Sequence, residues 1–242
     1  MSRSQPNISK NPAVRFMEWN GEKGNLKYYD KTAGEKGENI EVPLPFTFLW
    51  LDQTSKVGGW NDAAERSIYS NEVRNISQEA LTVRTSGSNI IAQGLYSEIK
   101  EKVKSNGGHY IASMYVAFKL DDELVIGNLG LKGAALQSWM EFYRKHQSEI
   151  HEKAVKISGF QEGKKGSITF KVPEFEIQEA AQETTDKAIE LDKELQKFLA
   201  SKPDTTVPVA NPYDVPEEPA HENTESNNTP ADDSDDSDGL PF

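Results

Sequence analysis

The alternation of apolar and polar residues in the first third of the chain is typical of short β-strands joined by tight turns. Segments rich in β-branched and aromatic residues fill 13–51, and one string, Gly-Glu-Lys-Gly, interrupts them at Gly21–Gly24 and again at Gly34–Gly37. Glycines placed between such segments are typical of hairpin loops. The body is therefore predicted to be mainly β and to begin with a meander. Further strands are predicted at Ala80–Thr85, His109–Leu120, Glu123–Leu129 and Gly166–Ile177.

Apolar residues that recur every three or four positions predict three helices. The first is marked by residues four apart from Leu95 to Val103, and the second by the apolar positions of Ala135–Tyr143. The third, Gln178–Ser201, has one apolar stripe among Lys and Glu and stops before Pro203. We expect this amphipathic helix to pack on the body or on a second copy of it. Its stripe consists of Ala188, Leu191, Leu195, Phe198 and Leu199.

The net charge of −12 belongs to the last forty residues. All 27 Lys and Arg lie at or before Lys202 with 28 of the 39 Asp and Glu, so that part carries −1 and the remainder carries −11. The hydrophobic share of the chain is 36%, below the roughly 45 to 50% of globular proteins. The sequence therefore predicts a body over 1–178, the amphipathic helix over 179–202, and a disordered acidic tail over 203–242.

Other features of the composition exclude several classes of protein. The chain has no cysteine, which rules out disulfides and thiol-ligated metals and fits a reducing compartment. The start of the chain is polar and has no apolar stretch of signal-peptide length. The longest bulky apolar run, Phe46–Leu51, is far too short to cross a bilayer. We therefore expect a soluble protein that stays in the cytoplasm.

The acidic tail ends in an apolar tip. No large apolar residue stands between Val215 and Leu240, and the chain then closes with Leu-Pro-Phe beside the terminal carboxylate. An acidic tail that only keeps a protein soluble gains nothing from a terminal Phe, whereas a partner with an apolar pocket and a basic rim would bind the ring, the Leu and the acids. The tip is therefore predicted to bind a partner weakly and in a salt-sensitive way.

This tip resembles that of the single-stranded DNA-binding proteins of bacteria and their phages, in which a disordered acidic tail recruits replication and repair enzymes. The resemblance covers about the last eleven residues, with Gly-Leu where the bacterial tip usually has Asp-Ile. It implies a cytoplasmic protein, located at replicating DNA in an infected bacterium, that recruits polymerase, helicase or recombination factors. The residues that carry it are Asp235, Asp236, Asp238, Leu240, Pro241 and Phe242.

The body departs from the bacterial members of that family. Their short strand pattern is not found in 1–178, and the predicted helices make the body larger. The stretch from Val42 to Val73 is similar to the bodies of phage-encoded members, which favours a phage origin. The fold that these observations predict is mainly β: an oligonucleotide-binding (OB) barrel with inserted helices, because barrels of this type offer a groove for a single strand.

A single strand would bind this body by base stacking more than by charge. Residues 1–178 carry 23 basic and 22 acidic groups, so no strong basic field exists, and stacking on aromatic rings contributes roughly 1 to 3 kcal/mol per base. Rings and cations interleave in two regions, one around the Gly-Glu-Lys-Gly turns and one after the Phe46–Leu51 run. The predicted DNA-binding residues are Lys23, Lys27, Tyr28, Tyr29, Lys31, Lys36, Lys56, Trp60, Arg66, Tyr69 and Arg74.

Several of these residues have a structural alternative. Tyr28 and Tyr29 are neighbours on a predicted strand and face opposite sides, so one of them is expected in the core. The alternating rings of Phe46–Trp50 are also expected in the core. Trp60 lies in a polar stretch read as a loop, where it is harder to bury and suits stacking. Lys164–Lys165 are expected on a solvated hairpin turn rather than at a phosphate.

Enzymatic sites are not predicted. A phosphate-binding loop fails because three residues, not four, separate Gly159 from Gly163. His146 and His151 are five apart, a spacing that does not align two metal ligands on a helix. The acidic cluster Asp121–Glu123 lies between two predicted strands and is read as a turn. No nucleophile has a base and an orienting partner, so we expect neither an enzyme nor a bound cofactor or metal.

These observations predict a protein that coats and protects single-stranded DNA in phage replication, recombination and repair. Its acidic tip would recruit partner proteins, and the chain is also a candidate for a homo-oligomer. Two alternatives remain. One is an acidic adaptor or DNA mimic that binds proteins and not nucleic acid. The other, which the sequence favours less, is a metal-dependent nuclease.

Overall fold

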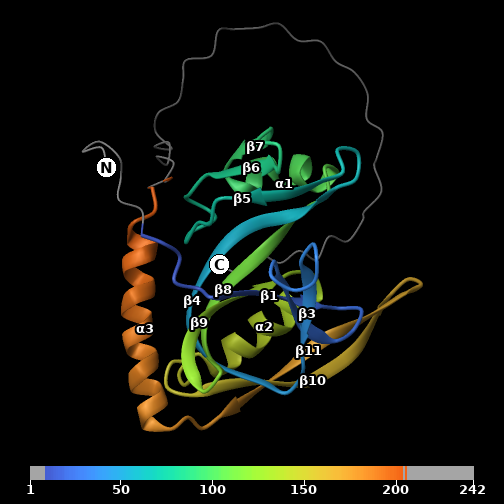
Figure 1. Cartoon of the computed structure of the whole chain (residues 1–242). Coiled ribbons are helices and arrows are strands. Elements are labelled where there is room, and N and C mark those ends of the chain that lie inside the picture. Colours follow the sequence, from blue (N-terminus) through green and yellow to red (C-terminus); the bar gives the residue numbers. More distant parts are fainter. Residues whose placement is uncertain (1–8, 204, 206–242) are drawn as a thin grey trace, which may run out of the picture.

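The computed structural model describes residues 9–203 and residue 205, and the described part is mainly β (Figure 1). It contains eleven strands and three helices. The predicted mainly β class and the three predicted helices are confirmed. In chain order the elements are β1 (Arg15–Asn20), β2 (Asn25–Asp30), β3 (Glu38–Val42), β4 (Phe46–Asn61), β5 (Arg66–Ser70), β6 (Leu81–Thr85), β7 (Ile90–Gly94), α1 (Tyr96–Ser105), β8 (Gly108–Leu120), β9 (Glu123–Leu131), α2 (Gly133–His146), β10 (Ala154–Lys165), β11 (Ile168–Gln178) and α3 (Gln182–Ala200).

The long strand β4 organises the sheet. It pairs with β8 from Phe48 to Gly59, and its other edge pairs with β10 near its start and with β5 near its end. Beyond β8 the order continues with β9, β1, β2 and β3, and β1 runs parallel to β9. A register shift between Trp50 and Asp52 interrupts the β4–β8 ladder, and bulges of this kind bend a strand.

The lower half of the sheet curves into a barrel-like shape around the largest apolar cluster. Phe48 and Trp139 are buried there, and α2 packs its buried side onto the cluster. The indole Nε1 of Trp19 donates to the carbonyl oxygen of Lys171 at 2.8 Å, and the Lys171 amide donates to the Gly21 carbonyl at 2.7 Å. These two hydrogen bonds join β11 to β1 and to the β1–β2 turn, although β11 and β1 lie on opposite sides of β4 in the strand order.

At the far end of β4 the sheet continues with β5, β6 and β7, and we call these three strands together with α1 the wing. Its own core includes Val57, Leu81 and Val103, all at most 1% exposed. Helix α1 packs on the sheet through this core, as Figure 1 shows at the top of the molecule. The wing is inserted between β4 and β8, so both halves of the molecule share the same two strands.

Helix α3 stands along the outer side of β4, β8 and β9 (Figure 1). Its buried residues Leu195, Phe198 and Leu199 pack against Tyr115 and Ile126. This confirms an amphipathic helix that packs on the body. The helix begins at Gln182 rather than Gln178, because β11 extends to Gln178.

Several sequence-based boundaries were wrong. Trp60 does not lie in a loop, because β4 continues without interruption to Asn61. Strands β5, β7 and β10 were missed. The hairpin predicted near Lys164–Lys165 is present, but its turn is at Gly166 and Ser167, and the two lysines are the last residues of β10. The turn at Asp121 and Asp122 is confirmed, and both φ angles there are positive at 49° and 66°. No helix in the described ranges has the length and apolarity needed to cross a membrane. The predicted tail lies outside the described residues, apart from its first positions.

Candidate functional site

One side of the sheet leaves large side chains exposed at the wing. Side chains alternate along a strand, so Trp60 of β4 points away from the side on which Val57 is buried. Tyr69 of β5 lies opposite Gly58 in the ladder, and Arg84 of β6 lies opposite Tyr69. The exposed fractions of the Trp60 and Tyr69 side chains are 51% and 46%. A tryptophan, a tyrosine and an arginine therefore share one exposed surface.

The same surface continues onto the N-terminal meander. On β1, Met17 is buried in the core and its neighbour Phe16 points outward, with 53% exposure. On β2, Tyr28 contacts the core and Tyr29 points outward, with 54% exposure. The ladder from β4 through β8 and β9 to β1 and β2 places Lys27 on this side too.

We call this surface the open face. It crosses seven strands, from β2 to β6 in the order of the sheet. Two glycines at its middle, Gly58 and Gly130, make room for the side chain of Ile111, whose Cδ1 lies 2.8 Å from the place that a Cβ of Gly58 would take. Its residues are Phe16, Glu18, Lys27, Tyr29, Lys56, Gly58, Trp60, Ser67, Tyr69, Thr82, Arg84, Ile111 and Gly130.

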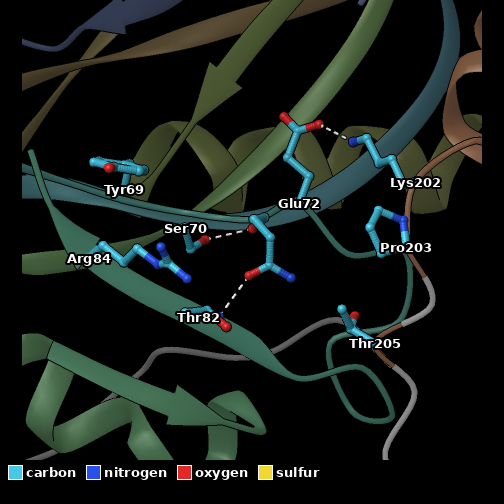
Figure 2. Close-up of a pocket in the computed structure, with 9 residues that line it drawn as sticks. Tyr69, Ser70, Glu72, Thr82, Arg84, Lys202, Pro203 and Thr205 are labelled. Carbon is cyan, nitrogen blue, oxygen red and sulfur yellow. Dashed lines mark hydrogen bonds and ion pairs between the residues drawn. The ribbon is translucent and has the colours of Figure 1, made fainter. Parts of the chain in front are cut away.

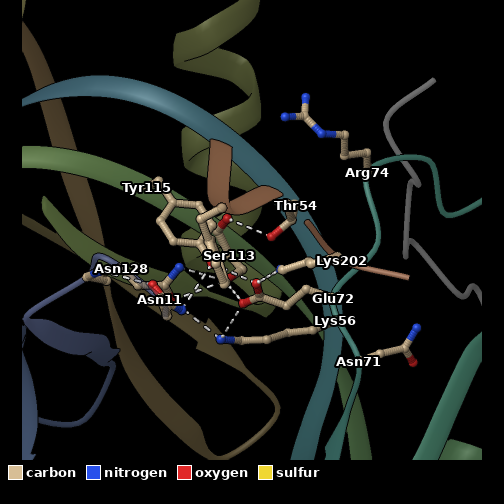
Figure 3. Close-up of polar contacts among 12 residues, drawn as sticks. Asn11, Thr54, Lys56, Asn71, Glu72, Arg74, Ser113, Tyr115, Asn128 and Lys202 are labelled. Carbon is tan, nitrogen blue, oxygen red and sulfur yellow. Dashed lines mark hydrogen bonds and ion pairs between the residues drawn. The ribbon is translucent and has the colours of Figure 1, made fainter. Parts of the chain in front are cut away.

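A buried carboxylate, that of Glu72, lies at the centre of this side of the sheet (Figure 3). Oε1 accepts a hydrogen bond from the Ser113 hydroxyl at 2.7 Å and lies 3.4 Å from Nζ of Lys56. Oε2 lies 2.7 Å from Nζ of Lys202 and accepts a hydrogen bond from the Tyr115 hydroxyl at 2.7 Å. Four partners thus meet the carboxylate, and Lys202 ties the end of α3 to the sheet.

These partners decide the protonation of the cluster. Burial disfavours the Glu72 carboxylate, but the charges of Lys56 and Lys202, with hydrogen bonds from Lys202 and Ser113, outweigh burial and lower its pKa to about 2. Burial, together with the Glu72 charge, raises the pKa of the Tyr115 hydroxyl well above its usual range. Glu72 is therefore ionised and Tyr115 is neutral at every physiological pH.

Five of the predicted DNA-binding residues lie on the open face, in one group on β2 and another on β4 and β5. Phe16 and Arg84 also lie there and were missed. Alternation within the predicted first strand was the signal for Phe16, since Met17 and Trp19 are the buried positions. Arg84 is part of the strand predicted at Ala80–Thr85, but nothing in the sequence indicated that the exposed side of this strand belongs to the binding surface. The five are Lys27, Tyr29, Lys56, Trp60 and Tyr69.

The other six lie elsewhere. Tyr28 faces the core side, as the alternation of the two tyrosines required. Arg66 lies opposite Asn61, so it is on the other face from Trp60. Arg74 lies beside α3, where its guanidinium pairs with Asp52 at 3.2 Å. The remaining three lie in exposed turns of the meander and are Lys23, Lys31 and Lys36.

Most of the cations on or near the open face already have acidic partners. Lys27 pairs with Glu18 at 2.8 Å, Lys56 pairs with Glu72, and Lys23 pairs with Glu41. A phosphate that approached these lysines would have to compete with carboxylates. The exposed ring faces, rather than the lysines, are therefore the groups of this surface that are open to a ligand, and of their polar atoms the Tyr29 hydroxyl already donates to the Lys36 carbonyl at 2.5 Å.

The histidines considered as metal ligands contact other side chains of the protein. In the described ranges no group of three or more His, Asp or Glu is placed to hold a metal ion. Nδ1 of His146 is hydrogen-bonded to Glu149 at 2.6 Å, and His151 packs edge-on against Trp50. Both histidines thus have structural contacts.

Comparisons with protein-family models, with curated proteins and with solved structures gave no match.

Proposed function

We propose that this protein binds single-stranded DNA on the open face and coats it during replication, recombination and repair. The observation that carries the proposal is the exposure of four aromatic rings, those of Phe16, Tyr29, Trp60 and Tyr69, on one side of one sheet. Phe16 and Tyr29 lie on neighbouring strands, as do Trp60 and Tyr69. Exposed apolar side chains that gather in this way mark binding surfaces, and every base has a face that can stack on such rings.

The topology supports assigning the lower half to the OB class. An OB fold is a five-stranded, partly open Greek-key barrel that binds oligonucleotides on its second and third strands and on two adjoining loops. In our assignment the five strands are β4, β8, β9, β10 and β11, because β4 pairs with both β8 and β10 and the others follow in sequence. The open face then includes the second and third strands, the wing forms one loop, and the β10–β11 turn forms the other.

The pairing of the lysines supports a stacking mechanism with a modest salt dependence. In single strands each neutralised phosphate contributes about 0.7 to the slope of log K against log salt. Lysines that exchange one anionic partner for another contribute less than free ones. We expect sequence-tolerant binding in which rings supply most of the affinity.

The decisive test is a titration with oligo-dT of increasing length, followed by tryptophan fluorescence, beside a duplex of equal length. The open face spans six inter-strand steps of about 4.8 Å, or about 29 Å, which about eight stacked bases would cover. Affinity should therefore rise with length up to at least about eight nucleotides, and the duplex should bind poorly. Failure to bind any oligo-dT would favour the adaptor or DNA mimic, and shortened DNA in the presence of magnesium would favour a nuclease.

The recruiting role of the tail remains a proposal that rests on the sequence. The tip residues Leu240 and Phe242, with Asp235, Asp236 and Asp238, would bind replication or recombination proteins, in keeping with the resemblance to phage single-stranded DNA-binding proteins. The acidic tail would also compete with DNA for the body, since a tethered segment acts at a high effective concentration.

Ending the chain after Thr205 should therefore tighten oligo-dT binding at low salt, because 10 acidic residues are removed and every residue of the open face is kept. The difference from the full chain should shrink as salt screens the charges. Equilibrium titrations of both chains across a salt series measure it. Equal or weaker binding by the shortened chain at low salt would argue against competition.

A further inference from the structure

The open face ends at the wing in a pocket of about 470 Å³, between β5, β6 and the chain that follows α3 (Figure 2). Figure 2 shows Tyr69 and Arg84 on one side of it and Lys202 and Pro203 on the other. Cavities of roughly 300 to 1,000 Å³ hold small ligands. The pocket is thus large enough for one nucleotide unit of a single strand.

Side-chain and backbone hydrogen bonds hold its walls in place. Oδ1 of Asn71 accepts from the Thr82 amide at 2.7 Å, and Nδ2 of Asn71 donates to the Ala80 carbonyl at 3.0 Å. The Ala80 amide in turn donates to the carbonyl oxygen of Thr205 at 2.9 Å. Because these walls are formed without a ligand, less ordering entropy is lost when one binds.

Arg84 is an unsatisfied cation in this pocket. Its exposed guanidinium has no hydrogen bond or ion pair with any residue in the described ranges. It lies directly opposite Tyr69 in the β5–β6 ladder, where the Cβ atoms of paired residues are about 4.5 to 5.5 Å apart. A planar guanidinium that can bind a phosphate with two hydrogen bonds is therefore next to a half-exposed ring on which a base can stack.

The remaining charges of the pocket do not oppose an anion. Its acidic residue, Glu72, is compensated by Lys56 and Lys202. Arg84 therefore adds positive charge that the lining does not cancel. The pocket is also continuous with the rest of the open face, because Trp60 lies diagonally across the β4–β5 ladder from Tyr69.

We propose that this pocket is a nucleotide subsite at one end of the strand path, in which Arg84 binds a phosphate and Tyr69 stacks on the adjoining base. This inference rests on the proposed function, and it adds a defined end to the path of the bound strand. A carboxylate of the chain's own acidic tail could also pair with Arg84, but a carboxylate would not stack on the Tyr69 ring. The two occupants therefore make different predictions for Tyr69 and for a shortened chain.

The test measures oligo-dT affinity for Arg84→Gln, Tyr69→Ala and Tyr69→Phe, each in the full chain and in a chain ending after Thr205. Arg84→Gln should weaken binding about tenfold or more in both chains, and lower the salt slope by about 0.7, the share of one phosphate. Tyr69→Ala should weaken binding by roughly 5-fold to 150-fold, and Tyr69→Phe should retain it. The matched control is Arg66→Gln, an exposed arginine of the same wing on the opposite face, which should bind like the parent.

Three results would overturn the subsite while leaving the proposed function intact. One is binding by the parent chain with affinity and salt slope unchanged in Arg84→Gln. Another is a loss in Arg84→Gln that appears only in the full chain, which would assign Arg84 to the tail. The third is an equal loss in Arg66→Gln, which would make the effect one of net charge. Absence of oligo-dT binding by the parent chain would instead refute the proposed function, and the subsite with it.

Discussion

Replacing Phe16 and Trp60 together by alanine is expected to weaken oligo-dT binding by at least about 30-fold, at roughly 1 to 3 kcal/mol for each stacked base. The two rings lie on β1 and β4, separated by β9 and β8, so their contributions should add. Neither ring is packed into the core, since both are more than half exposed. The thermal unfolding temperature should therefore change little, and titration of the folded variant measures the loss.

Fluorescence can assign part of this loss to one residue. Among the four tryptophans, Trp60 is 51% exposed, whereas Trp19 and Trp139 are at most 8% exposed and Trp50 packs against the core. Quenching on DNA binding should therefore come mainly from Trp60. Trp60→Phe should lose most of the signal and keep most of the affinity, as read by a labelled oligonucleotide, while Trp60→Ala should lose both.

The control for these ring variants is Ile189→Ala, since Ile189 is 51% exposed on α3 and is not on the open face. Unchanged affinity in the Phe16→Ala, Trp60→Ala double variant, with oligo-dT still bound by the parent, would place the binding site on another surface. Persistent quenching in Trp60→Phe would show that a buried tryptophan reports a change of shape instead of a stacked base.

Local pattern was sufficient for much of the fold. Alternation over His109–Leu120 and Glu123–Leu129 predicted β8 and β9, and spacing of three and four residues predicted all three helices. The missed strands are those with weak local signals: β5 is five residues with a single buried position, and β7 contains Gly94. They are strands because β4 offers an edge to β5, β6 offers one to β7, and the wing core buries Ile68 and Ala92 on their inner sides. A short window of sequence does not contain that information.

The site was harder to predict because its chemistry depends on partners distant in the chain. Exposed rings follow from alternation once the strands are known, as Tyr28 and Tyr29 show. The charges do not follow in this way. Lys56 was expected at a phosphate, yet it pairs with Glu72 sixteen positions away, and Lys202 reaches the same carboxylate across 130 positions. The nearly equal numbers of basic and acidic residues in the body indicated that ion pairs would form, but not which residues would form them.

The structure thus gives the rings and the charges different tasks. The faces of the rings on the open face are exposed, although the Tyr29 hydroxyl donates to the Lys36 carbonyl, whereas the central charges hold α3 and the loop after β5 to the sheet. Glu72 has a part in both stability and binding. It stabilises the junction of α3 and the sheet, and it neutralises two lysines beside the proposed strand path. A change at Glu72 should therefore move stability and binding in opposite directions.

Glu72→Gln is expected to lower the free energy of unfolding at pH 7 by about 3 kcal/mol. The pKa of Glu72 is about 2 in the folded protein, against a usual 4.5, and each unit is worth about 1.4 kcal/mol. Because the folded pKa is the lower one, this stabilisation is complete above about pH 5 and is lost as the pH falls towards 2. Denaturant unfolding of parent and variant across that range measures it.

The control for stability is Glu18→Gln, which removes an exposed partner of Lys27 on the same side of the sheet and should change stability little. The two curves of stability against pH should converge for Glu72→Gln and its parent as the pH approaches 2. Curves that stay parallel between pH 5 and pH 2 would contradict a depressed pKa for this carboxylate.

Binding should move the other way in the same variant. Without the Glu72 charge, the ammonium groups of Lys56 and Lys202 lose their anionic partner beside the open face, and each can pair with a phosphate. Oligo-dT should bind Glu72→Gln more tightly at low salt, with a salt slope steeper by up to about 1.4, the share of two phosphates in a single strand. Titration at a temperature where the variant is folded separates this gain from the loss of stability. Weaker binding with an unchanged slope would mean that the strand path does not pass these lysines, and that Glu72 serves the fold alone.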